Sequence, residues 1–262
     1  MEQSVHDNMN IAICVPLDLN NHGGVEKHIF SLAHALRQLG LRVDVFGNAT
    51  PHPENASRYN FLHLKTLNPQ RYNIVHTHSG LISMNLVKVL LNRYRRCRHV
   101  HTIHNFALGY LLACRTWLNW RCYSSTLVEA AWCRRADHVI AVSDYVRNNS
   151  LKLFRISPHK ITTILNGFTA DHFSTDARNR TRKCLGIEDG HIALLFIGRS
   201  ADRVKGAATV TATMKQLHNR LSALKLIAIP GDGFEPAPWL IRTGPVHHHD
   251  IIDYYAASDI FV

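Results

Sequence analysis

The stretch Ile192-Ala-Leu-Leu-Phe-Ile-Gly198-Arg-Ser-Ala-Asp-Arg-Val-Lys205-Gly206 decides the fold, because a basic, glycine-containing loop joins an apolar strand to a helix. Its first six residues form a continuous apolar run, which is typical of a buried strand in a parallel sheet. The two glycines let the backbone approach a ligand closely, and Arg199 and Lys205 supply two cations. We interpret the loop as a pyrophosphate-binding turn, since the start of a helix favours anions. Taken alone, the pattern fits a solvated surface turn equally well.

Short apolar strands alternate with amphipathic helices along the whole chain. The pattern predicts strands at 11–15, 42–46, 73–78, 99–103, 137–142, 160–165, 192–197, 225–229, 239–243 and 259–262. Among the predicted helices are those at 25–39 and about 81–92. Strands and helices in this order form right-handed crossovers over a parallel sheet. The sequence therefore predicts an α/β protein made of Rossmann-like domains.

A polar segment at 171–190 is interpreted as a connector that contains a short helix. It separates an N-terminal domain, residues 1–170, from a C-terminal domain, residues 191–262. The second domain is shorter than α/β domains of this kind normally are. Its last predicted strand has no crossover helix to cover its apolar faces. We therefore expect the second domain to be incomplete, so that either a partner covers these faces or the natural fold continues past Val262.

The composition is that of a globular protein with anionic partners. The 262 residues are 46% hydrophobic, and 30 Lys and Arg against 19 Asp and Glu give a formal net charge of +11. This excess favours nucleotide phosphates, acidic lipid head groups or nucleic acid. The six cysteines form no close pair, and no apolar run is long enough to cross a bilayer. Because the N-terminus has no signal-peptide pattern, we expect a cytoplasmic protein.

A second glycine pair, Gly23 and Gly24, follows the first predicted strand and opens the helix at 25–39. It is a second candidate anion site at a helix start. An isolated Gly-Gly pair is more often only a structural turn. Two such loops, one opening each domain, favour the functional interpretation.

Histidines follow two neighbouring predicted strands. His76 and His78 share one face of a strand, and His101 and His104 lie at the end of the next. A zinc cluster would use such side chains, but no carboxylate or cysteine joins them at ligand spacing. We therefore expect no metal, and the alternative for each histidine is a semi-buried side chain with satisfied hydrogen bonds.

Taken in order, the motifs resemble those of the retaining GT-B-fold glycosyltransferases of the group 1 or family 4 type. The matching segments are Gly23 to Glu26, Asn73 to His78, His101 to Asn105, Ala136 to Ser143, Ile164 to Gly167, Gly198-Arg199 with Lys205-Gly206, Gly231 to Gly233 and Asp253 to Val262. The resemblance covers nearly the whole chain. It implies a hexosyltransferase-like enzyme that moves a sugar, with retention, from a nucleotide-sugar donor to a lipid-linked or glycan acceptor in cell-envelope polysaccharide or lipopolysaccharide assembly.

The resemblance also implies roles for single residues and the absence of any cofactor or metal. Arg199 and Lys205 would stabilise the leaving nucleoside diphosphate, a role that needs preorganised cations. His104 would contact the donor sugar. The implied catalytic residues are His104, Arg199 and Lys205, and the implied donor-binding residues are Gly23, Gly24, Arg199, Lys205 and Gly231.

Two departures from the family pattern leave an alternative open. The paired glutamates that hold the donor sugar and ribose in this family would follow the strand at 259–262, where the chain ends. The segment 231–239 is also too short for the helix usually found there. The alternative is a truncated, catalytically impaired remnant, or a scaffold module that binds phosphates.

Two segments that mix basic, aliphatic and aromatic residues, 88–99 and 110–121, favour the surface of an anionic bilayer. Helices with buried aromatics and solvated arginines would show the same mixture. We expect docking on the inner face of the cytoplasmic membrane. We expect no nucleic acid partner, since there is no helix-turn-helix, zinc knuckle or aromatic sheet motif.

Overall fold

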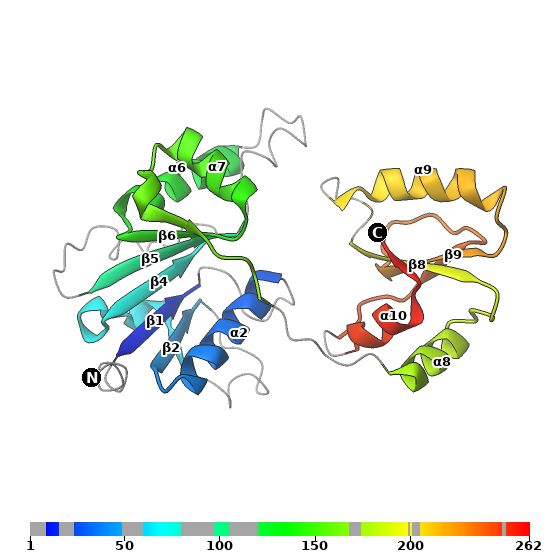
Figure 1. Ribbon diagram of the computed structural model, residues 1–262, viewed down its shortest axis with the longest axis horizontal. Helices are drawn as coiled ribbons and strands as arrows, with labels where there is room; N and C mark the ends of the chain where they lie inside the picture. Colours follow the sequence, from blue (N-terminus) through cyan, green and yellow to red (C-terminus); the bar gives the residue numbers. More distant parts are fainter. Residues whose placement is uncertain are drawn as a thin grey trace. The chain divides into compact units, whose positions relative to one another are not determined.

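The computed structural model describes residues 9–15, 24–48, 60–79, 97–104, 120–167, 174–198, 200, 205–247 and 250–262. The chain divides into two compact units, Met1–Gly167 and Phe168–Val262. Each unit has a parallel sheet with helices on both faces (Figure 1). The predicted α/β class is confirmed.

The first unit is built on a seven-stranded sheet in the order β3-β2-β1-β4-β5-β6-β7, in which all neighbours are parallel. Its strands are β1 (Asn10–Cys14), β2 (Arg42–Gly47), β3 (Asn60–His63), β4 (Ile74–His78), β5 (Arg98–Ile103), β6 (His138–Ala141) and β7 (Ile161–Thr163). Strand β1 lies between β2 and β4, so the strand order reverses direction there. In open α/β sheets, the crevice outside the carboxyl ends of the strands at this point is where ligands bind.

Helix α2 (Gly24–Gln38) covers one face of this sheet, and α6 (Trp120–Arg135) and α7 (Asp144–Phe154) cover the other (Figure 1). Ile29 and Ala33 of α2 are fully buried with the aliphatic side chains of β1 and β2. On the opposite face, α6 and α7 bury their apolar side chains against β5, β6 and β7. Apolar side chains of the strands are therefore buried on both faces of the sheet, which explains continuous hydrophobic runs such as residues 11–15.

The observed strands and helices lie close to their predicted positions, with a few differences. Ser143 accepts a hydrogen bond from the Val146 N–H at 3.2 Å and caps α7, as its place after a predicted strand indicates. The sequence analysis missed β3, a four-residue edge strand with no buried side chain. The helix predicted at 81–92 lies outside the described residues.

The second unit has a four-stranded sheet in the order β10-β9-β8-β11, again with parallel neighbours. Its strands are β8 (Ile192–Gly198), β9 (Leu224–Pro230), β10 (Leu240–Arg242) and β11 (Ile260–Phe261). Helix α9 (Ala207–His218) covers one face, and α8 (Thr175–Cys184) and α10 (Ile251–Ala257) cover the other (Figure 1). Residues 231–239 join β9 to β10 without a helix, as their length predicts.

Helix α8, which the sequence analysis placed in the connector at 171–190, packs against α10 within the second unit. Arg182 is only 8% exposed and donates to the carbonyl oxygens of Ala257 at 3.0 Å and His191 at 2.7 Å. Arg178 and Arg182 both reach the Asp259 carboxylate, at 2.6 and 3.3 Å. The arginines of this polar segment are therefore structural groups that hold α8, α10 and β11 together.

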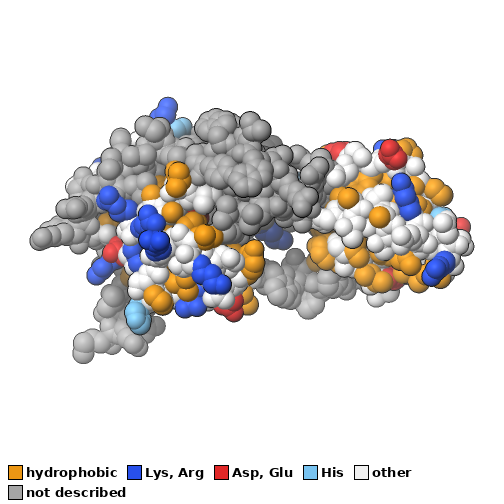
Figure 2. Space-filling model, turned by 90° about the horizontal axis from the view of Figure 1, so that it is seen from above, with side chains coloured by type: hydrophobic (Ala, Val, Ile, Leu, Met, Phe, Trp, Pro, Cys, Tyr) orange, Lys and Arg blue, Asp and Glu red, His pale blue; other side chains and the backbone are white. Residues whose placement is uncertain are grey.

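The face of the first unit seen in Figure 2 carries Lys and Arg side chains among apolar ones, with few acidic groups. This agrees with the formal net charge of +11. Among the described residues, no helix is long and apolar enough to cross a membrane.

Candidate functional site

A cluster of histidines lies at the carboxyl ends of β4 and β5. Because side chains alternate along a strand, His76 and His78 lie on the α2 side of the sheet, where the His78 ring is 5.7 Å from that of His28. Thr77 lies on the α6 side and contacts His99 and His101. The alternation of side chains therefore places the histidines in two layers, one on each face of the sheet.

The layer on the α2 side centres on His78 and His104. The His78 Nδ1 and His104 Nε2 atoms are 2.9 Å apart, and the His76 ring stacks on His78 with ring centroids 4.3 Å apart. His28 lies on α2, one turn after Gly24, and its ring centroid is 4.8 Å from that of His104. Burial lowers the pKa of the His104 imidazole to about 3 and that of His78 well below its ordinary value. These imidazoles are therefore neutral at pH 7.

The layer on the α6 side holds the end of β5 in place. The Ser79 Oγ accepts a hydrogen bond from the His104 backbone N–H at 3.0 Å and donates one to the Glu129 carboxylate. Glu129 Oε1 also lies 3.2 Å from His101 Nε2, and the Nδ1 of that ring is 2.7 Å from Thr77 Oγ1. A carboxylate therefore does reach the histidines, from a helix distant in sequence, which sequence spacing alone could not show.

In the second unit, the loop after β8 carries Lys205. Its Nζ donates to the Ile197 carbonyl oxygen at 3.2 Å, and its aliphatic stem lies beside Gly198. A Cβ on residue 198 would approach both the Lys205 Cδ and the Phe196 ring to 3.0 Å, so a glycine fits the close packing there. Gly206 has φ +75° and begins α9 without a side-chain cap. Lys205 thus lies next to an uncapped helix start, as the sequence predicts, whereas Arg199 and Gly23 lie outside the described residues.

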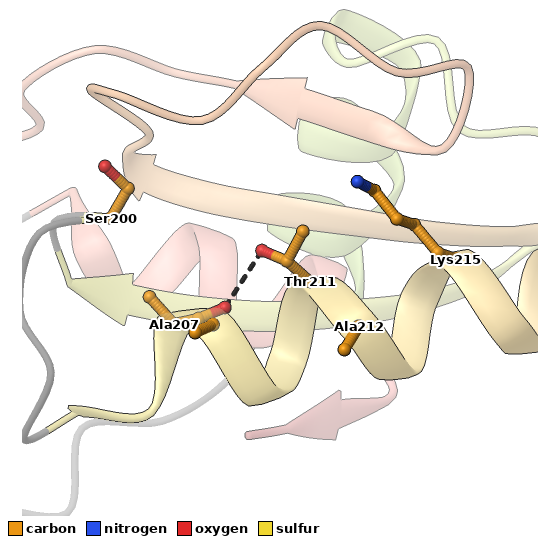
Figure 3. A pocket seen from close by; sticks show the side chains of 6 residues that line it. Ser200, Ala207, Thr211, Ala212 and Lys215 are labelled. Carbon is orange, nitrogen blue, oxygen red and sulfur yellow. Dashed lines mark hydrogen bonds between the residues drawn. The ribbon is translucent and has the colours of Figure 1, made fainter.

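A pocket of about 320 Å³ lies along the first half of α9. It is lined by Ser200, Ala207, Ala208, Thr211, Ala212 and Lys215. Figure 3 shows the Ser200 hydroxyl and the Lys215 ammonium near opposite ends of this surface, with the Thr211 hydroxyl between them. The Thr211 hydroxyl donates to the Ala207 carbonyl oxygen at 2.9 Å. The pocket therefore offers one cation and two hydroxyls beside an otherwise small, apolar helix face.

The turn after β9 lies against the same loop. Gly231 has φ +79°, and a Cβ there would lie 2.9 Å from the Ala228 carbonyl oxygen and from the Arg242 Cβ. Gly233 faces the Ser200 side chain closely, and the Ser200 N–H donates to the Asp232 carbonyl oxygen at 3.3 Å. The structure thus brings the predicted residue Gly231 and the loop after β8 to one edge of the second sheet.

The sequence analysis missed His28 and Glu129 as parts of the histidine site. Neither belongs to a motif with recognisable spacing. The available signal was topological, because the helix after β1 starts beside the carboxyl end of β4 in a parallel sheet with this strand order. A histidine one turn into that helix is placed to meet His78.

Residues 57–172 match the family model described as Glycosyltransferase Family 4. No protein of curated function matches the sequence. The structure resembles a sucrose-phosphate synthase from Thermosynechococcus elongatus, with a TM-score of 0.72, 18% identity, and coverage of 97% of this chain and 75% of that one. It also resembles HepE from Anabaena, solved with UDP and glucose, with a TM-score of 0.66, 16% identity, and coverage of 97% and 73%.

A further structural match is an α-glucosyltransferase solved with UDP and a DNA that contains an HMU base. Its TM-score is 0.57, its identity is 15%, and the match covers 97% of this chain and 71% of that one. At these identities the likeness shows the fold alone, two Rossmann-like units of the GT-B type.

Proposed function

We propose that this chain, whose residues 57–172 match the Glycosyltransferase Family 4 model, transfers a sugar, with retention, from a nucleotide-sugar donor to a lipid-linked or glycan acceptor. The family match carries this proposal. It runs from 57 to 172, so it includes β3 to β7 and the strand end that bears His104. The family match supports glycosyltransferase function in general. The donor, the stereochemistry and the acceptor belong to the proposal.

A nucleotide sugar is the proposed donor because HepE, which shares this fold, was solved with UDP and glucose. On this chain, the loop after β8 would bind the diphosphate. Lys205 supplies a cation there, and the uncapped start of α9 supplies backbone N–H groups. Arg199 would add the second charge, and Gly231 would allow the turn after β9 to approach the donor.

The first unit would contribute the start of α2 and the histidine at the end of β5. In the proposed mechanism, His104 contacts the donor sugar through a neutral imidazole, while Gly23 and Gly24 present backbone N–H groups to the donor. Preorganised cations beside the leaving diphosphate would stabilise the negative charge that develops as the glycosidic bond breaks. We propose that this stabilisation is sufficient without a metal or other cofactor.

The proposed acceptor side is the basic first unit, located on the cytoplasmic face of the membrane during cell-envelope polysaccharide assembly. Its positive charge favours anionic lipid, and the proposed acceptors exclude nucleic acid. Co-sedimentation with vesicles is expected to show binding to anionic lipid that weakens with salt. Equal binding to neutral vesicles would contradict a membrane-docked acceptor site.

Calorimetry with UDP and GDP tests the donor site. We expect binding of one of these nucleotides, and we expect Lys205→Ala to weaken it by about tenfold, because a charge-assisted hydrogen bond contributes about 1.5 kcal/mol or more. Lys183→Ala is the matched control, since Lys183 is an exposed lysine on α8, and its nucleotide affinity should equal that of the wild type. An unchanged affinity in Lys205→Ala would refute the assignment of this loop.

Transfer itself is tested with nucleotide sugars and a lipid extract, with duplex DNA as a second acceptor. An α-linked product from an α-linked donor, seen by NMR, is the expected result, whereas a β-linked product would contradict retention. Glycosylated DNA would contradict the proposed acceptor class. Nucleotide binding without transfer to any acceptor would favour the alternative, a module that binds phosphates but does not catalyse.

A further inference from the structure

We propose that His28, His78 and His104 together bind a divalent transition-metal ion of the zinc class. The three residues come from α2, the end of β4 and the end of β5. His104 is also the side chain proposed to contact the donor sugar, so the inference concerns the protein without bound donor, and failure to bind an ion would leave the proposed sugar transfer unaffected.

The geometry is that of a nearly formed metal site. Each ring offers one nitrogen, and the three nitrogen atoms lie within 4.8 Å of one another. Two nitrogen ligands of one tetrahedral zinc ion, each bonded at about 2.0–2.1 Å, are about 3.3 Å apart. The His78 Nδ1 and the His104 Nε2 are already 2.9 Å apart. Small rotations of the three rings would therefore bring all three nitrogen atoms within bonding distance of one ion.

The His78 ring is not fully engaged by the protein. This residue is 3% exposed, and its Nε2 is buried with no hydrogen-bond partner among the residues that the structure describes. Because no hydrogen bond holds this atom, the ring can turn its Nδ1 toward an ion without breaking a bond on the Nε2 side. Burial also keeps the imidazoles in the neutral form, which is the form that binds metal.

The surroundings hold one ligand firmly. The His104 backbone N–H donates to the Ser79 Oγ at 3.0 Å, and the Ser79 hydroxyl in turn donates to the buried Glu129 carboxylate. These bonds fix the backbone from which the His104 ring projects. The three ligands therefore lie on or directly beside rigid elements, helix α2 and the neighbouring strands β4 and β5.

The donor set selects the class of ion. Three imidazoles without a carboxylate in the group suit Zn²⁺, Cu²⁺ or Ni²⁺, whereas Mg²⁺ and Ca²⁺ prefer oxygen ligands. Three protein ligands leave at least one position of a tetrahedral ion for water or another small ligand. The proposed site is therefore an open one.

The experiment uses a parent protein in which His247, His248 and His249 are replaced by alanine, because this histidine triplet could bind metal independently. Zinc is titrated against a chromophoric chelator, and Co²⁺ is titrated as a spectroscopic probe. We expect one tight zinc equivalent that excess Mg²⁺ does not displace. The variants His28→Ala and His104→Ala should each weaken it at least about tenfold, since even residues behind the ligands contribute that much.

His159→Ala is the matched control, because His159 is an exposed histidine of the same unit, and it should bind zinc as the parent does. Circular dichroism checks the fold, and His28→Gln replaces His28→Ala if the latter is misfolded. X-ray absorption at the zinc edge of the parent provides a readout that needs no ligand variant, with at least three imidazole nitrogens expected. Unchanged zinc affinity in both ligand variants, or fewer than three imidazoles around the ion, would overturn the proposal.

Discussion

The two units stabilise polar side chains in opposite ways. In the first unit, β4 and β5 carry histidines that are buried and neutral, such as His99 near the start of β5, whose pKa burial lowers to about 3. In the second unit, Arg178 and Arg182 surround Asp259 with charged hydrogen bonds. Burial by itself would raise the pKa of Asp259, but the Ala193 N–H and the two arginines outweigh it and keep the pKa below its ordinary value.

This difference follows from the partners available at each place. A histidine with neutral hydroxyls and other histidines around it loses its charge when it leaves water, because nothing compensates for the loss of solvation. A carboxylate that meets two guanidinium groups keeps its charge. The neutral histidines keep lone pairs that can bind a ligand or an ion. The hydrogen bonds between the two arginines and Asp259, in contrast, hold α8 to α10 and β11. A candidate site is therefore expected where polar groups are neutral and incompletely bonded.

The largest expected effect concerns the arginine network. Arg182→Ala removes a buried guanidinium and leaves several carbonyl oxygens without a donor, so we expect a loss of about 3 kcal/mol in the stability of the second unit. The control on the same helix is Arg180→Ala, because Arg180 is 65% exposed and lies 3.5 Å from Asp253. This surface pair should contribute less than about 1 kcal/mol. Hydrogen exchange in β8 measures the stability of both variants. Equal losses would show that the burial of Arg182 does not account for its contribution to stability.

The next largest expected effect is a loss of stability in the first unit at acid pH. The folded pKa of His99 is about 3 and its ordinary value is 6.5, so the unfolded chain binds more protons between these values. Stability of the first unit should therefore fall as the pH falls below about 6.5, by about 2 kcal/mol from His99 at pH 5. His101 and Lys160 lower this pKa further, while Asp137 opposes them.

Hydrogen exchange in β5 at pH 7 and pH 5 measures this loss, and His99→Gln should reduce it by about 2 kcal/mol. Asp259 responds in the same direction but in a lower pH range, since its pKa is lowered from 3.8 and its contribution is lost only as the pH falls below that value. Exchange in β8 should therefore change little from this source between pH 7 and pH 5. An equal loss of stability in the two units between pH 7 and pH 5 would contradict the distinction between the neutral histidines of the first unit and the charged network of the second.

The smallest expected effect concerns Ser79. Ser79→Ala removes the acceptor of the His104 N–H and the donor to Glu129, which leaves two buried groups without these partners. We expect a loss of about 1 to 2 kcal/mol in the first unit, since each unsatisfied group has a cost of that order. Ser222→Ala, at an exposed serine, should change the stability of the chain by less than about 0.5 kcal/mol. Urea denaturation followed by exchange in β4 and β5 compares the two variants, and matching stabilities would show that Ser79 is not a necessary link.

Much of the fold could be predicted because its signals are local. The apolar runs of β1 and β8 mark strands buried on both faces, and the loop that contains Gly198 marks a strand-to-helix turn. Strand β3 was missed because an exposed edge strand of four residues has no such run. His104 could be singled out because, at the end of a predicted strand, it matches the histidine that contacts the donor sugar in the family that the sequence resembles.

The contacts of the site could not be predicted in the same way. Glu129 meets Ser79 across 50 residues of sequence, and His78 meets His104 across 26. Arg178 and Arg182 reach Asp259 across still longer separations, and the sequence analysis placed them in a polar connector that contains a short helix. Each of these contacts depends on the order of strands in a sheet, which no single segment specifies.

The sequence by itself determined the alternation of strands and helices, the glycine turns that begin α2 and α9, and the basic character of the chain, because each depends on neighbouring residues or on composition. Only the tertiary structure decided which histidines meet, which carboxylate joins them and which arginines are buried. The physical reason is that a parallel sheet brings the carboxyl ends of its strands to one edge, so residues far apart in sequence share one environment. Their solvation, and therefore their charge and their capacity to bind a ligand, is set by that environment rather than by their sequence neighbours.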